Sequence, residues 1–160
     1  MVNLNDLMEE QLREMYDGES QFSKALSLIL PMATNSKLCE LIIEYQKNSE
    51  DQIIRLKQVF NLLFKQKRGE SNEVIRAMIH EAQNIIDRSM DFAVMDAGIV
   101  TTLQHIIHYK IAAYGAICNY SNILGLYEEA GIIHKNLEVE KRYDRELANL
   151  AQSSINLEAV

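Results

Sequence analysis

The stretch HIIHYKIAAYG, from His105 to Gly115, lies in the most apolar part of this chain. Between Ala97 and Leu126 the sequence has a single formally charged residue, Lys110. The apolar residues predict a buried helix from about Phe92 to Leu124, with Gly125 just beyond its end. Because an isolated charge is expensive to bury, the position of Lys110 needs a physical explanation.

Helical spacing of apolar residues predicts further helices on both sides of this segment. Pro31 falls near the end of the first helix, and Thr34, Asn35 and Ser36 can each cap the start of the second. The second helix is expected to end near Gly69, and the helix after it is shorter. The expected helices run over Leu4–Met32, from the candidate caps at 34–36 to about 69, and over Ser71–Asp87, Phe92–Leu124 and Tyr127–Asn156.

Four of these helices are long, roughly 25 to 33 residues each, and the short one lies between the second and third of them. Short turns make neighbouring helices antiparallel, and the extra helix takes the place of a longer crossover connection. The sequence therefore predicts an all-α fold, a ferritin-like four-helix bundle formed by one domain over residues 1–160. A plain helical bundle fits the same apolar stripes.

The composition argues against several classes of function. The 160 residues include 16 Lys and Arg but 23 Asp and Glu, so the formal net charge is −7. Nucleic-acid binding through a basic face is therefore not expected. The N-terminal residues lack the apolar segment of a signal peptide, and no uninterrupted apolar run is long enough for a membrane span. We expect a cytoplasmic protein with no membrane or nucleic-acid partner.

Polar residues also interrupt the apolar stripes of the other long helices. Glu19 lies on the stripe of the first helix, and Glu140 and Asp144 lie on that of the last. Ser49 and Gln52 lie on the stripe of the second. All are near the middle of their helices, so an antiparallel bundle would place them in one layer with the lone lysine. Buried carboxylates must be paired, hydrogen-bonded or metal-bound, and inward-facing Glu and His residues build di-iron and di-manganese sites in bundles.

Five segments, in collinear order, give the chain a family resemblance from about Leu4 to Ala151. They are YDGESQFSKAL (Tyr16–Leu26), ATNSKL (Ala33–Leu38), DQIIRLKQVF (Asp51–Phe60), DAGIVTTLQHIIHYKIAAYG (Asp96–Gly115) and LEVEKRYDREL (Leu137–Leu147). With these segments the chain resembles the YciE/YciF-type bacterial ferritin-like proteins. The resemblance implies a ferritin-like bundle, a stress-associated role whose biochemistry is poorly defined, and a homodimer.

At the metal site of that family, this sequence departs from the pattern. Family members read roughly Glu-His-Tyr-Glu where this chain has Ile107 to Lys110, so both carboxylates of that helix are missing. They carry Glu-Glu-Thr in the second helix, where this chain has Lys-Asn-Ser from Lys47 to Ser49. Carboxylates that match the family pattern remain at Glu19, Glu138, Glu140 and Asp144.

These departures lead us to expect a degenerate dinuclear site in which Lys110 supplies the charge that metal ions supply in relatives. Its ammonium is expected to reach Glu19, Glu140 or Asp144, the residual metal-ligand set, inside the bundle. On this hypothesis the protein is non-catalytic and needs no cofactor. The alternative is that the Lys110 side chain extends to a helix edge and only its stem packs.

Two other functions stay open on the sequence alone. One is a di-iron or di-manganese carboxylate protein with oxidase, ferroxidase or catalase-like activity. Its iron or manganese ligands would come from Glu19, Glu50, Glu140, Asp144 and His108, with Gln52 as a further candidate. His105 and His108 are three residues apart, a spacing that can chelate a metal, although such histidines more often serve packing. The other is a helical protein-interaction module, which an exposed apolar stripe on Ser71–Asp87 would favour.

Overall fold

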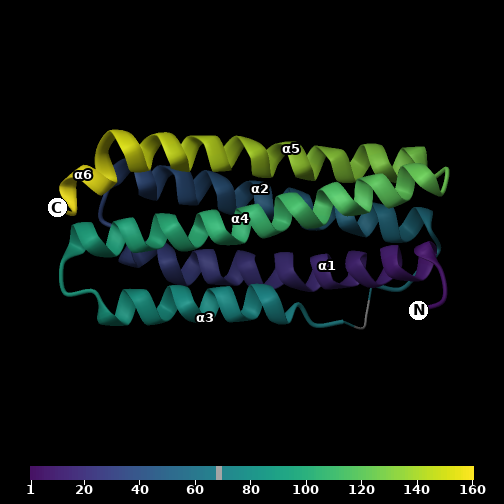
Figure 1. Cartoon of the computed structure of the whole chain (residues 1–160), viewed down its shortest axis with the longest axis horizontal. Coiled ribbons are helices and arrows are strands. Elements are labelled where there is room, and N and C mark those ends of the chain that lie inside the picture. Colours follow the sequence, from purple (N-terminus) through teal and green to yellow (C-terminus); the bar gives the residue numbers. More distant parts are fainter. Residues whose placement is uncertain (68–69) are drawn as a thin grey trace.

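The computed structural model describes residues 1–67 and 70–160, which form helices and turns without a strand. Figure 1 shows the long helices of this part side by side along one axis, with the shorter α3 beside α1 and α4. The expected all-α bundle, with an extra helix between the second and third long helices, is therefore confirmed. The elements are α1 (Leu4–Ile29), a 3₁₀ turn (Leu30–Met32), α2 (Ser36–Leu62), α3 (Glu73–Arg88), α4 (Phe92–Ile123), α5 (Tyr127–Leu150), a π-helical turn (Ala151–Ile155) and α6 (Asn156–Glu158). Among these described helices, none combines the length and the apolar character needed to cross a bilayer.

Helix ends form where side chains or special backbone conformations satisfy the terminal peptide groups. Asn35 Oδ1 accepts hydrogen bonds from the backbone N–H groups of Lys37 and Leu38 at 3.1 and 3.2 Å, which caps the start of α2. At the other end of the bundle, Gly125 follows α4 with φ 76°. This is the left-handed conformation expected just beyond a helix, so the predicted end of α4 is confirmed.

The end of α2 differs from the prediction. The helix ends at Leu62 and does not continue to Gly69, which lies outside the described residues. Phe64 adopts φ 53°, and the N–H of Lys65 donates to the carbonyl oxygen of Phe60 at 3.0 Å, which closes the last turn. Because this left-handed position holds Phe and not the usual Gly, the sequence carries no glycine signal for the stop.

A buried carboxylate fixes the connection between α1 and α2 against α4. Asp96 accepts hydrogen bonds from the N–H of Thr34 at 2.9 Å, from its hydroxyl at 2.7 Å, and from the N–H of Asn35 at 2.8 Å. Charge-assisted hydrogen bonds of this kind are stronger than neutral ones. Two of the five family-like segments, one around Thr34 and one beginning at Asp96, therefore meet at the same end of the bundle.

The short helix α3 covers the side of the bundle formed by α1 and α4. Its inward residues Ile75, Ala82 and Ile86 are buried in the main core. Gly98 of α4 permits this close approach, because a Cβ at that position would overlap Ile85 of α3. The apolar stripe of α3 therefore packs inside the chain, and the exposed stripe that would favour an interaction module is not found among the described residues of this helix.

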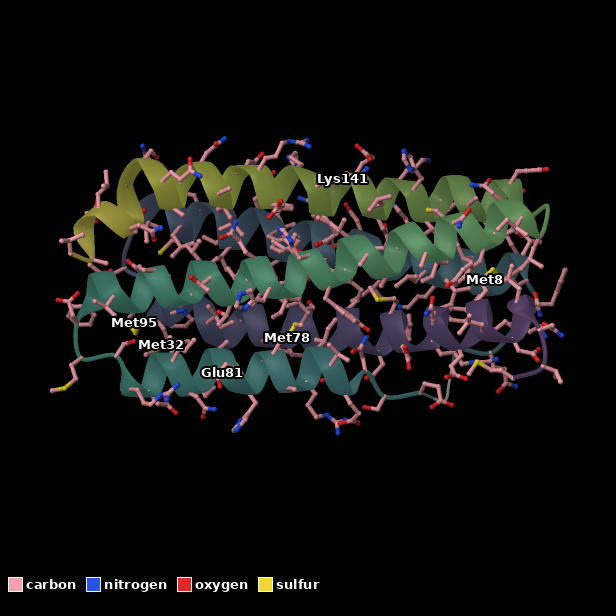
Figure 2. All side chains as sticks on the ribbon, in the orientation of Figure 1. Met8, Met32, Met78, Glu81, Met95 and Lys141 are labelled. Atoms are coloured by element: carbon pink, nitrogen blue, oxygen red, sulfur yellow. The ribbon has the colours of Figure 1, made fainter. Side chains whose placement is uncertain are left out.

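The core consists of two apolar clusters that lie one after the other along the bundle. Met95 and Met8, labelled towards opposite ends of Figure 2, belong to the first and second cluster respectively. Every long helix contributes to both clusters, and on each helix a buried polar residue lies between the two contributions. The clusters are therefore separated by a polar layer across the middle of the bundle.

Candidate functional site

The polar layer is built from one stretch of each long helix. It contains Glu19 of α1, Ser49 and Gln52 of α2, Lys110 of α4 and Glu140 of α5, all fully buried. The sequence-based expectation that Glu19, Lys110 and Glu140 share a layer is therefore confirmed.

Lys110 lies between the two glutamates. Its Nζ is 3.0 Å from Glu19 Oε2 and 2.8 Å from Glu140 Oε1, and it donates to the Tyr45 hydroxyl at 3.2 Å. The ammonium also lies 4.7 Å from the ring centroid of Phe22 and 5.1 Å from that of Tyr45, within the range of cation–π attraction. The Lys110 side chain is 0% exposed, so the alternative in which it extends to a helix edge is wrong.

Each carboxylate accepts further hydrogen bonds. Glu140 accepts from the amide of Gln52 at 2.5 Å and from the hydroxyl of Tyr45. Glu19 accepts from the hydroxyl of Tyr114 at 2.5 Å and from Ser49 at 3.4 Å. Burial of a carboxylate is tolerated when its oxygens accept hydrogen bonds in this way. Side chains inside the bundle therefore supply the hydrogen bonds of both carboxylates.

Asn136 supports the layer from α5, one turn before Glu140, and sequence reasoning missed it. Its amide nitrogen donates to the Tyr114 hydroxyl at 3.3 Å and to the backbone carbonyl oxygen of Gln52 at 3.2 Å. Arg55 in turn donates to its side-chain oxygen at 3.2 Å. The available signal was its spacing of four residues from Glu140 on the same helix face. One buried acceptor, Gln52 Oε1, has no hydrogen-bond partner among the described residues.

The charges of the layer do not balance if both glutamates are ionised, because one ammonium faces two carboxylates. Burial alone would lower the pKa of Lys110, but Glu140 and Glu19 outweigh it and raise that pKa above the ordinary lysine value. Burial, with the charge of Glu140, raises the pKa of Glu19 against the opposing effect of Lys110. The layer thus favours a protonated lysine and shifts Glu19 towards its neutral form.

The tyrosines of the layer act as hydrogen-bond donors. Burial, together with the nearby carboxylates, raises the pKa values of Tyr45 and Tyr114 well above the ordinary tyrosine value. Both hydroxyls therefore keep their protons at neutral pH and donate to Glu140 and Glu19 respectively. Each of these two hydroxyls thus connects its own helix to a buried carboxylate of another helix.

Asp144 does not belong to the layer, contrary to the prediction. Its Oδ1 lies 2.8 Å from His108 Nε2 near the surface, where the two side chains are 26% and 66% exposed. The inward face of α5 passes through Glu140, Tyr143 and Leu147, which are buried. Residue 144 is one step beyond Tyr143, a rotation of about 100° around the helix, so its carboxylate points away from Lys110.

The remaining metal-ligand candidates do not converge either. Glu50 and His105 are exposed, and the His105 side chain lines a surface hollow with Ala77, Met78, Glu81 and Thr102. Gln52 does reach the layer, where it donates to Glu140. Within residues 1–67 and 70–160, no group of three or more His, Cys, Asp or Glu side chains is placed to hold a metal ion.

The two carboxylates that do meet are a poor fit to a dinuclear metal site. Such sites in bundles use several Glu and His side chains from all four helices, whereas here α2 contributes Ser49 and Gln52. The Lys110 ammonium also lies between the two glutamates, where a cation would have to bind. The donor set of this chain therefore does not match the metal centre that its family resemblance implies.

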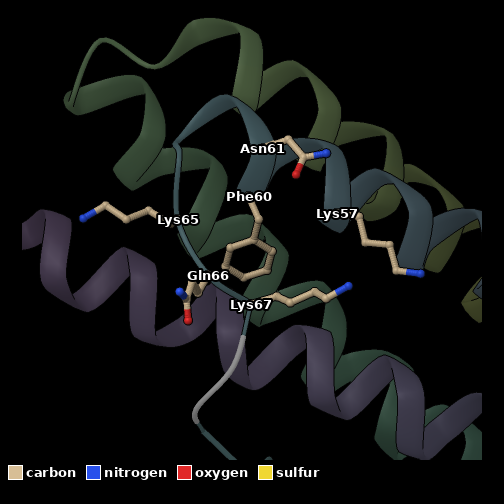
Figure 3. A pocket seen from close by; sticks show the side chains of 6 residues that line it. All are labelled: Lys57, Phe60, Asn61, Lys65, Gln66 and Lys67. Carbon is tan, nitrogen blue, oxygen red and sulfur yellow. The ribbon is translucent and has the colours of Figure 1, made fainter.

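A surface hollow of about 450 Å³ lies at the end of α2, away from the layer, and is lined by Lys57, Phe60, Asn61, Lys65, Gln66 and Lys67 (Figure 3). The ring of Phe60 is buried and faces the core, while Lys65 extends away and pairs with Glu9 at 2.8 Å. This hollow brings together no group that could act as a nucleophile–base pair or a metal site.

Comparisons with known proteins agree with the fold and place the chain in a family. The sequence model of a family described as "Domain of unknown function (DUF892)" matches residues 3–160. Protein YciF of Escherichia coli K12 is 29% identical over 163 residues, which cover 99% of this chain and 96% of YciF.

Two solved structures resemble the whole bundle. The crystal structure of the E. coli stress protein YciF matches with a TM-score of 0.93 and 27% identity, over 98% of this chain and 99% of that one. YcfI from Rhodopseudomonas palustris matches with a TM-score of 0.89 and 32% identity, over 91% and 93% of the two chains. The YciF resemblance and the ferritin-like fold expected from the sequence are thus confirmed, and the chain belongs to the DUF892 family.

Proposed function

We propose that this protein is a non-catalytic, stress-associated member of its family, in which the Lys110 ammonium replaces the metal charge of a dinuclear site. The observation that carries the proposal is the position of Nζ, 3.0 Å from Glu19 and 2.8 Å from Glu140. In this view the polar layer is structural: it joins α1, α4 and α5 through one cation, and it needs no cofactor.

Electrostatics favours this assignment over a site that waits for metal. Two carboxylates in a dry core repel each other unless a cation lies between them, and Lys110 of α4 supplies that cation to Glu19 of α1 and Glu140 of α5. Tyr45 and Tyr114 donate to the carboxylate oxygens that Lys110 does not contact, and Gln52 donates to the same Glu140 oxygen as Lys110. A metal ion would have to displace the ammonium and compete with these donors.

The stress-associated part of the proposal rests on the relative. The E. coli protein that this chain matches along almost its whole length is described as a stress protein. We extend that description to this chain, together with a homodimeric state and the absence of nucleic-acid or membrane partners. Size-exclusion chromatography with light scattering tests the dimer.

Elemental analysis tests the metal-free assignment. The protein is purified without a metal-chelating tag, dialysed against buffer containing iron or manganese, and analysed by plasma mass spectrometry. We expect far less than one metal ion per chain. About two iron or manganese ions per chain would overturn the proposal and support the metal-dependent oxidase alternative.

A restoration experiment tests the idea that the layer descends from a metal site. The triple variant Ile107→Glu, Lys110→Glu and Asn48→Glu replaces the cation and adds carboxylates to α2 and α4. We expect it to bind manganese measurably by calorimetry. The matched variant has Gln at the same three positions, so its side chains have similar shapes but no charge. We expect this variant to bind no manganese. A correctly folded Glu variant that takes up no metal would contradict the degenerate-site interpretation.

A further inference from the structure

The polar layer holds an amine and a carboxyl group in contact inside a dry core. Lys110 Nζ lies 2.8 Å from Glu140 Oε1, and both side chains are fully buried. Groups fixed in this way react as if at very high concentration, with effective molarities of about 10⁵–10⁸ M for well-oriented pairs. An amine beside a carboxyl can lose water to form an amide, and exclusion of bulk water favours that product.

We propose that Lys110 and Glu140 condense to an amide that crosslinks α4 to α5, with Glu19 as the proton carrier. The inference rests on the proposed function, because the ion pair that replaces the metal charge is the reactant, and it goes beyond it by assigning that pair a covalent product. In condensed molecules a neutral amide takes the place of the ammonium and of the Glu140 carboxylate. No cofactor, oxidant or other co-reactant is required.

The cost of burying the charges of the ion pair favours its conversion to an amide. Buried ions lose hydration that their mutual attraction repays only in part, whereas an amide is neutral and costs less to bury. Proton transfer along the 2.8 Å contact converts the ammonium and carboxylate into an amine and a carboxylic acid. Glu140 and Glu19 raise the pKa of Lys110, so the charged form of the pair dominates in the core. The neutral, reactive form is a minor species, and the condensation is therefore slow.

The reaction balances within the layer. The Lys110 nitrogen attacks the carboxyl carbon of protonated Glu140 and forms the C–N bond. Glu19, whose Oε2 is 3.0 Å from Nζ, accepts a proton from that nitrogen and returns it to the departing hydroxyl. The C–O bond breaks, one water molecule leaves, and Glu19 ends in the protonation state in which it began.

The donors around the two glutamates select Glu140 as the acceptor. Tyr45 and Gln52 both donate to the Glu140 carboxyl group, and such donors stabilise the negative charge that develops on oxygen as the nitrogen attacks. Glu19 has one close donor, Tyr114, and a longer contact to Ser49 at 3.4 Å. Glu19 is therefore better suited to exchange protons than to be attacked.

Intact-mass spectrometry of the full-length, denatured protein tests the proposal. We expect a species lighter than the sequence mass by one water, and its fraction should grow while the folded protein is incubated. Trypsin does not cleave after an acylated lysine, so the digest should contain Ser89–Lys135 joined to Asn136–Lys141. A wild-type protein that keeps its full mass after prolonged incubation in the folded state would overturn the crosslink, as would a water loss mapped elsewhere.

Matched variants separate the roles of the three residues. Lys110→Arg keeps the cation but removes the amine, and we expect its full mass. Glu140→Gln offers an amide as acceptor, so its product should be lighter by one ammonia in place of one water. Glu19→Gln keeps both reacting groups and should remain uncondensed. If it still condenses, Glu19 is not the proton carrier. Circular dichroism of each variant confirms folding before its mass is interpreted.

Failure of the crosslink and failure of the proposed function can be told apart. An uncondensed protein that also binds no metal overturns the amide and leaves Lys110 as the replacement for metal charge. A protein that binds about two metal ions per chain overturns both, because the cation would then have been displaced from Glu140.

Discussion

Replacing Lys110 with methionine removes the positive charge from the polar layer while filling most of its volume. Methionine is long and flexible, so the variant should leave no large cavity between Phe22 and Tyr45. What remains is a pair of fully buried carboxylates, Glu19 and Glu140, without a cation. The change therefore tests the electrostatic contribution of the lysine with little change in packing.

The expected magnitude follows from the burial of all three charged groups. Removing one partner of a buried ion pair typically costs about 3 to 5 kcal/mol, because the other charge is stranded. In this variant the stranded carboxyls can take up protons, which places the expected loss near the lower end, about 3 kcal/mol at pH 7. For a chain of this size, about 2–4 °C of melting temperature is lost per kcal/mol, so the midpoint should fall by about 6–12 °C.

The loss should depend on pH, and its sign is fixed by Glu19. Burial raises the pKa of Glu19 and Lys110 opposes that rise, so the variant should have a still higher Glu19 pKa. A group whose pKa is raised on folding adds stability below its unfolded pKa, and that contribution is lost as pH rises through the folded pKa. The stability difference between wild type and variant should therefore be large at pH 7 and shrink on acidification towards the ordinary Glu value of about 4.3.

Urea denaturation followed by circular dichroism at pH 7 and pH 5 provides the measurement. The wild-type reference is the fraction that retains the full sequence mass, so that the ion pair and not an amide is compared. Lys57→Met is the matched control, because it makes the same substitution at an exposed position of α2, where a change within about 0.5 kcal/mol is expected. A loss of that small size for Lys110→Met, or a large loss that does not change with pH, would refute the electrostatic argument.

Three further predictions concern the scaffold, and urea denaturation checks each of them. Gly98→Ala should lower the free energy of unfolding by about 1–3 kcal/mol, because the added Cβ would overlap Ile85. Gly115→Ala, on the same helix, adds a Cβ that meets no atom within 4 Å, and it should raise the free energy of unfolding by about 0.5–1 kcal/mol. Phe64→Gly should raise the free energy of unfolding by about 1 kcal/mol, because Phe64 has φ 53° and is 96% exposed, so little packing is lost. Phe64→Ala keeps the strained Cβ and should not raise it. Asp96→Ala leaves three donors without their carboxylate and should cost about 3 kcal/mol; an effect below 1 kcal/mol would mean that solvent replaces it.

The helices could be predicted from the sequence because the signals that form them are local. Apolar residues three and four apart define the buried faces, and caps such as Asn35 and Gly125 mark ends within a few residues. The end of α2 could not be predicted, because a left-handed Phe64 stops the helix where glycine usually does. That conformation is stabilised by the turn around it and leaves no compositional mark.

The site could be predicted in part, because a charged residue at a buried helix position can be recognised in the sequence. Glu19, Lys110 and Glu140 lie at core positions of helical stripes, where a charged residue needs a partner, so their convergence follows from energetic necessity. Asp144 shows the limit of this reasoning. It is four residues after Glu140, and residues at that spacing often lie on the same helix face. In α5, however, the buried face follows Glu140, Tyr143 and Leu147, so Asp144 lies beside that face.

Contacts that cross between helices could not be read from any one segment. The donation from Tyr45 to Glu140 joins residues 95 positions apart, and so does that from Tyr114 to Glu19 on the other side of the layer. Sequence spacing says that these tyrosines face inward but not which carboxylate each one meets. That depends on the relative height of the four helices, which is a property of the packed bundle.

The polar layer itself fixes that relative height. On each long helix the residue or residues that belong to the layer lie between the contributions to the two apolar clusters, so the layer lies at one level of the bundle. If one helix slid by a single turn, about 5.4 Å, its polar residue would enter an apolar cluster and leave its partners behind. Purely apolar stripes would tolerate such a slide far better, because neighbouring apolar side chains are similar in size. A layer made of Lys110 and two glutamates therefore specifies the register of the bundle, independently of any metal binding. This structural role is sufficient to explain a single lysine in the most apolar helix of an acidic chain.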